Sequence, residues 1–262
     1  MIPYFPQPTL HLGPLTLHAF GVLVALAVIV GGAMARRHAR KLGVADSLIV
    51  NLLTWTVVGG FVAGHVLDQV LYFPRETMAD PVRLLRLWDG LSSFGGFVGG
   101  VLGACAFLAR RKLAGRRWAA LDAVAYGFPF GWIFGRLGCF VAFDHPGIPT
   151  HSLLGQRYVD GVVRHNLGLE EALFTLGLAA VFYVLGRRPK PHGFFVALLA
   201  ILYAPVRFSL DTMRIDDARY LGLTPAQYGS AALLLLGIVL MRGAIRRGGG
   251  APTLGDASPG AA

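Results

Sequence analysis

Seven apolar stretches constrain the fold of this chain more than any other feature of its sequence. They lie at about 15–35, 48–72, 91–109, 118–143, 170–186, 193–210 and 226–241, and each is long enough, or nearly so, to cross a hydrocarbon core ~30 Å thick. Hydrophobic residues make up 55% of the 262 residues and charged residues only 15%, which is typical of a polytopic membrane protein. The sequence therefore predicts an all-α integral membrane protein with about seven transmembrane helices.

Residues 1–247 are expected to form one integral membrane domain, because the sequence contains no long soluble insert and no convincing internal repeat. Residues 248–262 are rich in Gly, Ala and Pro, and we expect a disordered tail there. The polar stretch at about 144–169 is expected to lie on the outer face. The glycines between 95 and 103, with Gly59, Gly60 and Gly64, have the small-residue spacing that lets helix backbones approach closely.

Basic residues indicate which way the chain crosses the membrane, because loops rich in Arg and Lys are retained in the cytoplasm. Fifteen of them follow the first, third, fifth and seventh stretches, at 36–41, 110–117, 187–190 and 242–247, and eight lie on the opposite side. We therefore expect the N-terminus outside and the C-terminus in the cytoplasm. The net charge of +10 is clustered in these short loops, which fits anionic lipid headgroups better than nucleic acid, and no nucleic-acid partner is expected.

Arg136 stands out because it lies inside an otherwise uncharged apolar run, between Gly135 and Gly138. An arginine at bilayer depth costs roughly 2.5–3.5 kcal/mol on insertion scales, so such residues are rare, face a polar cavity and are usually functional. The neighbouring glycines leave room for a headgroup against the backbone. The segment therefore predicts a polar site within the membrane.

Other polar residues lie in or beside apolar stretches on the same, outer side. They are His65 and Asp68, three residues apart; Asp144 and His145, just after the fourth stretch; Arg207, Asp211 and Arg214, on one helical stripe; and Glu170 and Glu171, at the start of the fifth stretch. Each pair alone is equally explained as an ion pair that holds helices together, for example Arg136 with Asp68 or Arg207 with Asp211. Together they favour a cavity for an anionic lipid phosphate held by arginines, since every buried charge adds a desolvation cost.

A metal site formed by His65, Asp68, Asp144 and His145 is the other reading of these residues, because imidazole and carboxylate groups suit several divalent ions. The four residues lack a signature spacing, so no metal is expected. Neither Cys105 nor Cys139 belongs to a CxxC pair.

From about Gly13 to Arg242 the chain resembles the prolipoprotein diacylglyceryl transferase family, which are seven-helix enzymes of the bacterial cytoplasmic membrane. The family signature has the form G-R-x-G-N-F-x-N-x-E-x-x-G, and the sequence here reads GRLGCFVAFDHPG from Gly135 to Gly147. Further matches are Gly13-Pro14 with Leu17-His18, Ala79-Asp80-Pro81 to Trp88-Asp89-Gly90, Gly95-Gly96, His165 to Glu171, and Arg207-Phe208 through Asp211, Arg214 and Asp216 to Gln227.

The resemblance implies transfer of a diacylglyceryl group from phosphatidylglycerol to the thiol of a lipobox cysteine in a prolipoprotein, with release of glycerol phosphate. It implies that Arg136 binds the lipid phosphate and that Arg207 and Arg214 help to hold the phosphate or its leaving group. Phosphatidylglycerol, the lipobox segment and membrane lipids are then the partners, and no soluble cofactor is implied.

The chain departs from the family at residues that carry chemistry. Phe94 replaces the usual histidine before the paired glycines, Phe20 replaces a tyrosine, and Cys139 and Ala142 replace the two asparagines of the signature. Phenylalanine cannot take a proton. His65 stands where the family commonly has arginine, and Asp68 and His145 are not part of the usual pattern.

A base must therefore come from another residue. We expect His65, oriented by Asp68, to be the first choice, and His145 beside Asp144 to be the second. Two other functions remain open: transfer to a different acceptor, and phospholipid binding without catalysis. A channel or transporter is disfavoured, because the sequence lacks matched Pro-interrupted helices in its two halves.

Overall fold

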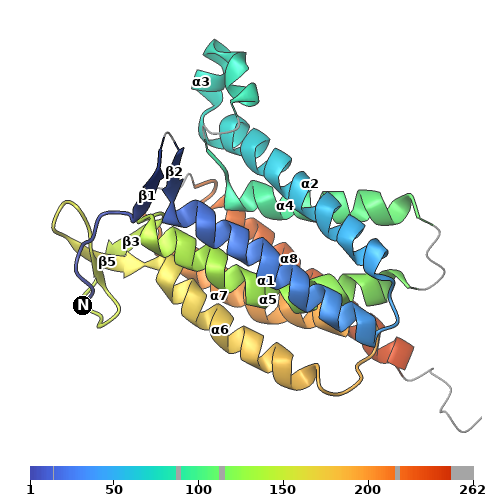
Figure 1. Ribbon diagram of the computed structural model, residues 1–262. Coiled ribbons are helices and arrows are strands. Elements are labelled where there is room, and N and C mark those ends of the chain that lie inside the picture. Colours follow the sequence, from blue (N-terminus) through green and yellow to red (C-terminus); the bar gives the residue numbers. More distant parts are fainter. Residues whose placement is uncertain (14, 87–89, 112–115, 216–218, 249–262) are drawn as a thin grey trace, which may run out of the picture.

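The computed structural model describes residues 1–13, 15–86, 90–111, 116–215 and 219–248, and most of them are helical (Figure 1). The α-helices are α1 (Ala19–Lys41), α2 (Asp46–Tyr72), α3 (Pro74–Ala79), α4 (Ser93–Ala109), α5 (Arg117–Val141), α6 (Leu167–Leu185), α7 (Phe194–Thr212) and α8 (Pro225–Gly248). A 3₁₀ helix, η1, covers Pro81–Leu85. The strands are β1 (Thr9–Leu12), β2 (Leu15–His18), β3 (Pro146–Pro149), β4 (Gln156–Arg157) and β5 (Val163–Asn166).

Six of these helices, α1, α2, α5, α6, α7 and α8, are long and apolar enough to cross a membrane. Helix α4 is shorter, with 17 residues, but it packs alongside α2 over its length and returns the chain to the end at which α2 and α5 begin (Figure 1). The predicted all-α polytopic fold is confirmed. The predicted tail at 248–262 lies outside the described residues from Gly249 onward.

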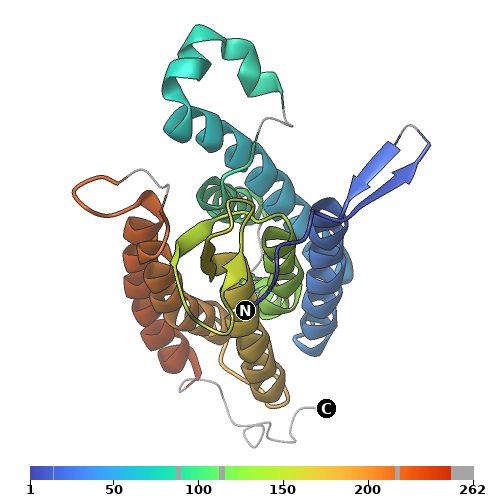
Figure 2. The same cartoon turned by 90° about the vertical axis from the view of Figure 1, so that its left-hand side faces the viewer.

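Two parts of the predicted pattern need correction. The first apolar stretch was expected at about 15–35, but 15–18 form β2, and α1 starts at Ala19 and continues to Lys41. The strand β2 pairs with β1, so the backbone there already has partners and the helix begins later. The polar stretch at 144–169, expected to lie on the outer face, contains an antiparallel sheet of order β3-β5-β4, and the all-α prediction included no strands there. In Figure 2 this sheet lies in front of the helix ends, beside the N-terminus.

Close packing of α4 on α2 depends on glycine, as the spacing predicted. A Cβ atom at Gly99 would lie 2.1 Å from the carbonyl oxygen of Gly59, and one at Gly103 would lie 2.2 Å from that of Trp55. The same arrangement joins α5 to α1, where a Cβ at Gly131 would lie 2.4 Å from the carbonyl oxygen of Ala27. Small residues let membrane helices pack by van der Waals contact where no hydrophobic force drives them together.

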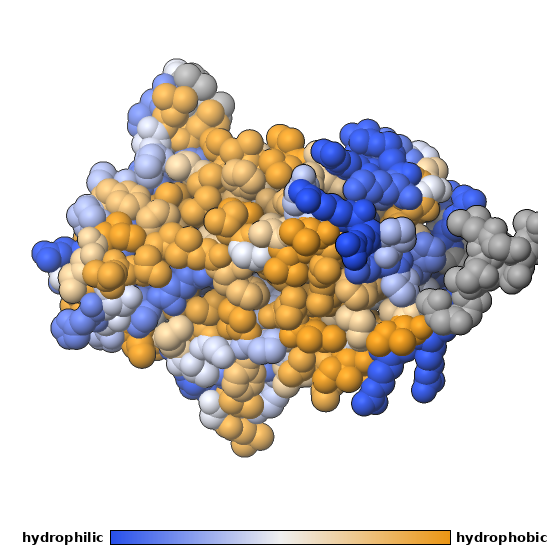
Figure 3. All heavy atoms as spheres, turned by 90° about the horizontal axis from the view of Figure 1, so that it is seen from below, coloured by the Kyte–Doolittle hydropathy of each residue, from blue (hydrophilic) through white to orange (hydrophobic). Residues whose placement is uncertain are grey.

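The outer surface of the bundle is apolar along most of its length. Half or more of the surface of Ile29, Val101, Val184 and Val239 is exposed, on four different helices. Figure 3 shows this apolar surface and a gathering of hydrophilic residues at the end where α1 and α6 finish. An apolar belt of this kind is expected of a protein whose solvent is lipid.

Candidate functional site

A cavity of about 280 Å³ opens at the end of the bundle that carries the three-stranded sheet. Five of the seven predicted site residues line it: Asp68, Asp144, His145, Arg207 and Arg214. The remaining wall consists of Tyr72, Phe73, Leu91, Ser92, Phe94, Pro146 and Ala226. The helices α2, α4, α7 and α8 and the segment after α5 therefore contribute to a single site, and the residues that the sequence grouped on one side of the membrane do meet.

The segment after α5 has an unusual backbone that presents Asp144 and His145 to the cavity. Phe143 and His145 have positive φ angles of 57° and 59°, which are uncommon for residues other than glycine and which often occur at functional sites. The backbone N–H of Asp144 donates to the carbonyl oxygen of Cys139 at 3.0 Å, and that of Ile148 donates to Met213 at 2.9 Å. These bonds hold the segment against the end of α7, where Arg214 follows.

His145 lies between a cation and a carboxylate. Its Nδ1 accepts a hydrogen bond from Nη2 of Arg214, and its Nε2 lies 3.2 Å from Oδ2 of Asp144. Burial and the charges of Arg214, Arg136 and Arg207 lower the pKa of His145 from its ordinary 6.5 to about 2. His145 is therefore a neutral imidazole whose Nε2 proton points to Asp144.

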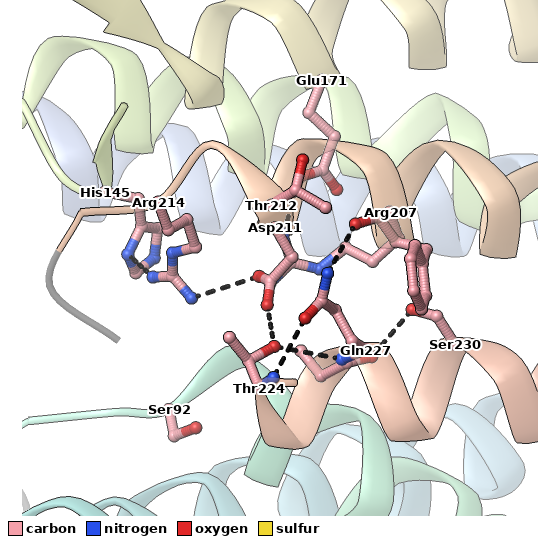
Figure 4. A network of polar contacts seen from close by, with 12 residues as sticks. Ser92, His145, Glu171, Arg207, Asp211, Thr212, Arg214, Thr224, Gln227 and Ser230 are labelled. Carbon is pink, nitrogen blue, oxygen red and sulfur yellow. Dashed lines mark hydrogen bonds and ion pairs between the residues drawn. The ribbon is translucent and has the colours of Figure 1, made fainter. Parts of the chain in front are cut away.

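The arginines of α7 and of the segment after it share one carboxylate (Figure 4). Nη2 of Arg207 lies 3.0 Å from Oδ1 of Asp211, and Nη1 of Arg214 lies 3.5 Å from the same oxygen. The other oxygen of Asp211 accepts a hydrogen bond from the hydroxyl of Thr224, whose backbone N–H donates to Oε1 of Gln227 at 3.0 Å. The start of α8 thereby fixes Asp211, and Asp211 keeps both arginines at the cavity wall.

Arg136 lies behind the cavity, at the centre of a second polar cluster. It is 2% exposed, and its Nε lies 2.9 Å from Oε1 of Glu171, which is 1% exposed. Glu171 also accepts from Nε1 of Trp132 at 2.9 Å and from the hydroxyl of Tyr203, and its Oε2 lies 3.8 Å from Nη1 of Arg207. Glu171 is thus the link between Arg136 and an arginine that lines the cavity.

The guanidinium of Arg136 is not fully satisfied by this cluster. Its Nη2 is buried and has no hydrogen-bond partner among the described residues. Its Nη1 lies 3.7 Å from Sγ of Cys139, and the guanidinium stacks over Trp132 with 4.5 Å between Cζ and the ring centre. The sequence offered Asp68 as an ion-pair partner for Arg136, but the structure pairs it with Glu171.

His65 is completely buried, and both of its ring nitrogens lie next to backbone carbonyl oxygens. Nδ1 is 3.0 Å from the oxygen of Gly90, and Nε2 is 3.2 Å from that of Arg83. Asp68, on the cavity wall, accepts instead from Nε2 of Gln69 at 3.3 Å. The expected His65–Asp68 hydrogen bond is not found among the described residues, and His65 ties the chain after α3 to α2.

Phe94, at the position where the family usually has histidine, lines the cavity. Phe20 packs against α5, where a Cβ at Gly138 would lie 3.1 Å from its ring. Neither ring can exchange a proton, so any acid–base chemistry in this cavity comes from the polar residues around them.

One group of described residues could hold a metal ion: the side-chain donor atoms of Cys139, Asp144 and His145 lie within 4.8 Å of one another. Two arginines already occupy these donors, because Arg214 donates to His145 and Arg136 lies against the sulfur of Cys139. A divalent cation would have to displace both positive charges. The cluster is therefore better suited to an anion than to a metal.

Glu171 was grouped with the other charged residues but not predicted as a catalytic or binding residue, although its charge at the start of an apolar stretch is a signal similar to that of Arg136. Tyr72 and Ser92 of the cavity wall carried no such signal, because an isolated hydroxyl at the end of an apolar stretch is common. Their place in the site depends on the packing of α2 and α4.

A polytopic membrane protein with an arginine-lined polar cavity near one membrane face is thus defined by its fold and its site. The chain belongs to the prolipoprotein diacylglyceryl transferase family, whose family model matches residues 7–242. It is similar to the phosphatidylglycerol–prolipoprotein diacylglyceryl transferase of Chromohalobacter salexigens, with 31% identity over 87% of this chain and 88% of that protein. The protein of the same name from Janthinobacterium is 30% identical over 92% of this chain and 97% of its own.

Proposed function

We propose that this protein transfers a diacylglyceryl group from phosphatidylglycerol to the lipobox cysteine of prolipoproteins in the bacterial cytoplasmic membrane. Membership of the family supports this reaction. The observation that carries it is that Arg207 and Arg214 line the same cavity as Asp144 and His145. Cations for a phosphate and a candidate proton acceptor are thereby next to each other.

The reaction makes one bond and breaks one. The sulfur of the acceptor cysteine forms a thioether with the glycerol carbon of the diacylglyceryl group, and the bond from that carbon to the phosphate oxygen breaks. Glycerol phosphate leaves with the bonding electrons, and the thiol proton passes to a base. A free cysteine has a pKa of about 8.5, so a base and nearby cations both assist.

Arg207 and Arg214 hold the phosphate in this proposal. A guanidinium binds two phosphate oxygens with parallel N–H donors, and the leaving group gains negative charge that two arginines stabilise. Asp211 holds both arginines in position before the lipid arrives. Arg136 does not contact the phosphate in this proposal but neutralises Glu171. Without Arg136, the buried charge of Glu171 would compete with the phosphate for Arg207.

His145 is the base in this proposal, and phosphate binding activates it. In the free protein Arg214 occupies Nδ1 of His145 and helps to keep its pKa low. When the phosphate takes Arg214, the Nδ1 lone pair becomes available, and the negative charge of the phosphate raises the pKa of the imidazole. Asp144, at Nε2, orients the ring and stabilises its protonated form. His65 holds the backbone at Arg83 and at Gly90 instead of exchanging a proton.

Phe94 favours a second candidate function, in which the phospholipid cavity is kept but the acceptor is different or the transfer is lost. The phenylalanine replaces a residue that can carry a proton and lies on the cavity wall itself. The two functions differ in whether glycerol phosphate is released.

The test is single-turnover release of glycerol phosphate by the purified protein, given phosphatidylglycerol and a lipobox peptide, with the lipidated peptide identified by mass spectrometry. We expect release in the wild type and loss in His145→Ala, with lipid binding measured in parallel. Lipid binding without release, for a range of lipobox peptides, would support the second function.

A further inference from the structure

A second cavity, of about 200 Å³, lies at the opposite end of the bundle from the site described above. It is formed where α1 and α6 end on either side of α5. Its lining consists of Met34, Arg37, His38, Lys41, Tyr126, Tyr183 and Arg187. A water molecule occupies about 30 Å³ in the liquid, so the cavity has room for a phosphate group.

The charge of this cavity is uncompensated. Among the described residues, no carboxylate forms an ion pair with Arg37, Lys41 or Arg187. By contrast, two arginines of α1 outside the cavity do have an acidic partner, because Asp46 lies 2.6 Å from Arg36 and 3.9 Å from Arg40. Lys41 reaches across the cavity and donates to the carbonyl oxygen of Gly186 at 3.3 Å. Three positive side chains therefore converge on a space that contains no negative one.

His38 is the second, independent sign of a ligand. The side chain is 4% exposed, lines the cavity, and stacks on Tyr126 with 4.0 Å between ring centres. Neither of its ring nitrogens has a hydrogen-bond partner among the described residues. Burying a polar group without a partner is unfavourable, and a bound acceptor or donor would remove this penalty.

Basic residues at the ends of α1 and α6 also stabilise the helix dipoles and help to set the topology. Neither role accounts for the unpartnered nitrogens of His38 or for the cavity itself. We propose that this cavity is a binding site for the phosphate group of an anionic phospholipid headgroup, separate from the catalytic cavity. Arg37 and Lys41 bind it from α1, Arg187 binds it from the end of α6, and His38 forms the floor.

The surroundings favour a lipid over free phosphate. Met34 and Tyr183 flank the cations, and Tyr183 is 48% exposed on the apolar surface of α6. Tyrosine is typical of the boundary between headgroups and acyl chains. Basic pockets between transmembrane helices on the cytoplasmic side are suited to anionic headgroups. A bound headgroup would join α1 to α6, which both pack on α5.

The proposal is tested by hydrogen–deuterium exchange on the purified full-length protein, followed in peptides that cover 34–42 and 183–188. The probes are dihexanoyl-phosphatidylglycerol, dihexanoyl-phosphatidylcholine and inorganic phosphate. We expect the first to protect both peptides and the second to protect neither. Protection by inorganic phosphate at the same concentrations would assign the site to free phosphate, whereas protection by the lipid alone would assign it to the headgroup. Because the readout is local, lipid in the catalytic cavity does not interfere.

The double variant Arg37→Gln/Arg187→Gln should bind dihexanoyl-phosphatidylglycerol about thirtyfold more weakly at these peptides, which corresponds to about 1 kcal/mol for each basic residue. The matched control, Arg188→Gln/Arg242→Gln, removes the same charge from exposed residues at the same end of the bundle and should bind like the wild type. His38→Phe keeps the stacking on Tyr126 and should weaken binding with no loss of thermal stability. Equal weakening in the control pair, unchanged binding in the double variant, or equal protection by the phosphatidylcholine would overturn the proposal.

Discussion

Arg214 donates a hydrogen bond to Nδ1 of His145 across the wall of the arginine-lined cavity. The contact joins a residue that can bind phosphate to a residue that can accept a proton. If Arg214 binds the phosphate and His145 accepts the proton, as proposed, the two events are coupled, because an anion that binds Arg214 changes the hydrogen bond to His145.

The low pKa of His145 predicts a specific pH dependence of stability. The pKa is about 2 in the folded protein and about 6.5 when unfolded, so the unfolded state binds more protons between these values. The stabilising contribution is complete above pH 6.5 and is lost as the pH falls toward 2. In His145→Asn, whose side chain tolerates the positive φ, this acid-side loss should be smaller. Thermal midpoints of both proteins from pH 7 to pH 4 measure it, and parallel curves would contradict the low pKa.

Arg136 is predicted to support lipid binding in a way that lysine cannot. Arg136→Ala leaves the buried charge of Glu171 without its main partner and should cost about 3–5 kcal/mol of unfolding free energy. Arg136→Lys keeps the charge but holds Glu171 less firmly without the planar fork, so it should cost less stability yet still weaken anionic-lipid binding, because Glu171 then competes with the phosphate for Arg207. Chemical denaturation in detergent and lipid-binding assays separate the two effects. Wild-type lipid affinity in the lysine variant would show that Arg136 has only a structural role.

His65 is predicted to act through the chain that it holds. His65→Gln can still donate to the carbonyl oxygen of Gly90 or Arg83, so it should keep much of the turnover, while His65→Ala should lose more. Single-turnover release of glycerol phosphate by both variants checks this, with His145→Ala as the comparison. Complete loss in His65→Gln with normal lipid binding would restore His65 as the base.

The close contact of α2 and α4 predicts opposite effects for two glycine substitutions. Gly99→Ala places a methyl group 2.1 Å from the carbonyl oxygen of Gly59 and forces the helices apart, which should cost about 1–3 kcal/mol. Gly177→Ala in α6 meets nothing within 4 Å and should be neutral or stabilising by up to about 1 kcal/mol. Thermal unfolding in detergent distinguishes them. A Gly99→Ala variant as stable as Gly177→Ala would mean that α2 and α4 are farther apart.

The distribution of basic residues predicts the orientation of the chain. Fifteen arginines and lysines follow the odd-numbered apolar stretches, and eight, besides Arg136 within the fourth stretch, lie on the side of the arginine-lined cavity. A reporter enzyme fused after Arg247 should be active only in the cytoplasm, and this result would place the arginine-lined cavity at the outer face. Activity of this fusion on the outside would reverse the topology.

The transmembrane helices could be predicted because their signal is local: a run of apolar residues of sufficient length is visible without any contact. The strands β3, β4 and β5 were missed because they have two to four residues each and no alternation of apolar and polar side chains. The start of α1 was misplaced because residues 15–18, which read Leu-Thr-Leu-His, were counted with the apolar stretch but belong to a hairpin.

The site was predictable to the extent that charged residues in apolar stretches must be near one another. That argument correctly grouped Asp68, Asp144, His145, Arg207 and Arg214 around one cavity. It could not predict which of these residues form hydrogen bonds or ion pairs with one another. His65 lies three residues before Asp68 on the same helix, yet its ring nitrogens contact the carbonyl oxygens of Arg83 and Gly90, which lie 18 and 25 residues later in the sequence.

The arginine-lined cavity is divided between two parts of the fold: α2 and α4 supply Asp68 and Phe94, whereas the rest of the bundle supplies His145 and both arginines. Helix α4 packs mainly on α2, so the glycines between these two helices determine the position of the part of the cavity wall that α4 forms. Gly99 does not line the cavity, yet a substitution there would move α4 relative to α2 and so change the width of the cavity. In a screen for inactive variants, such glycines would be mistaken for catalytic residues unless assembly of the two parts is measured separately from chemistry.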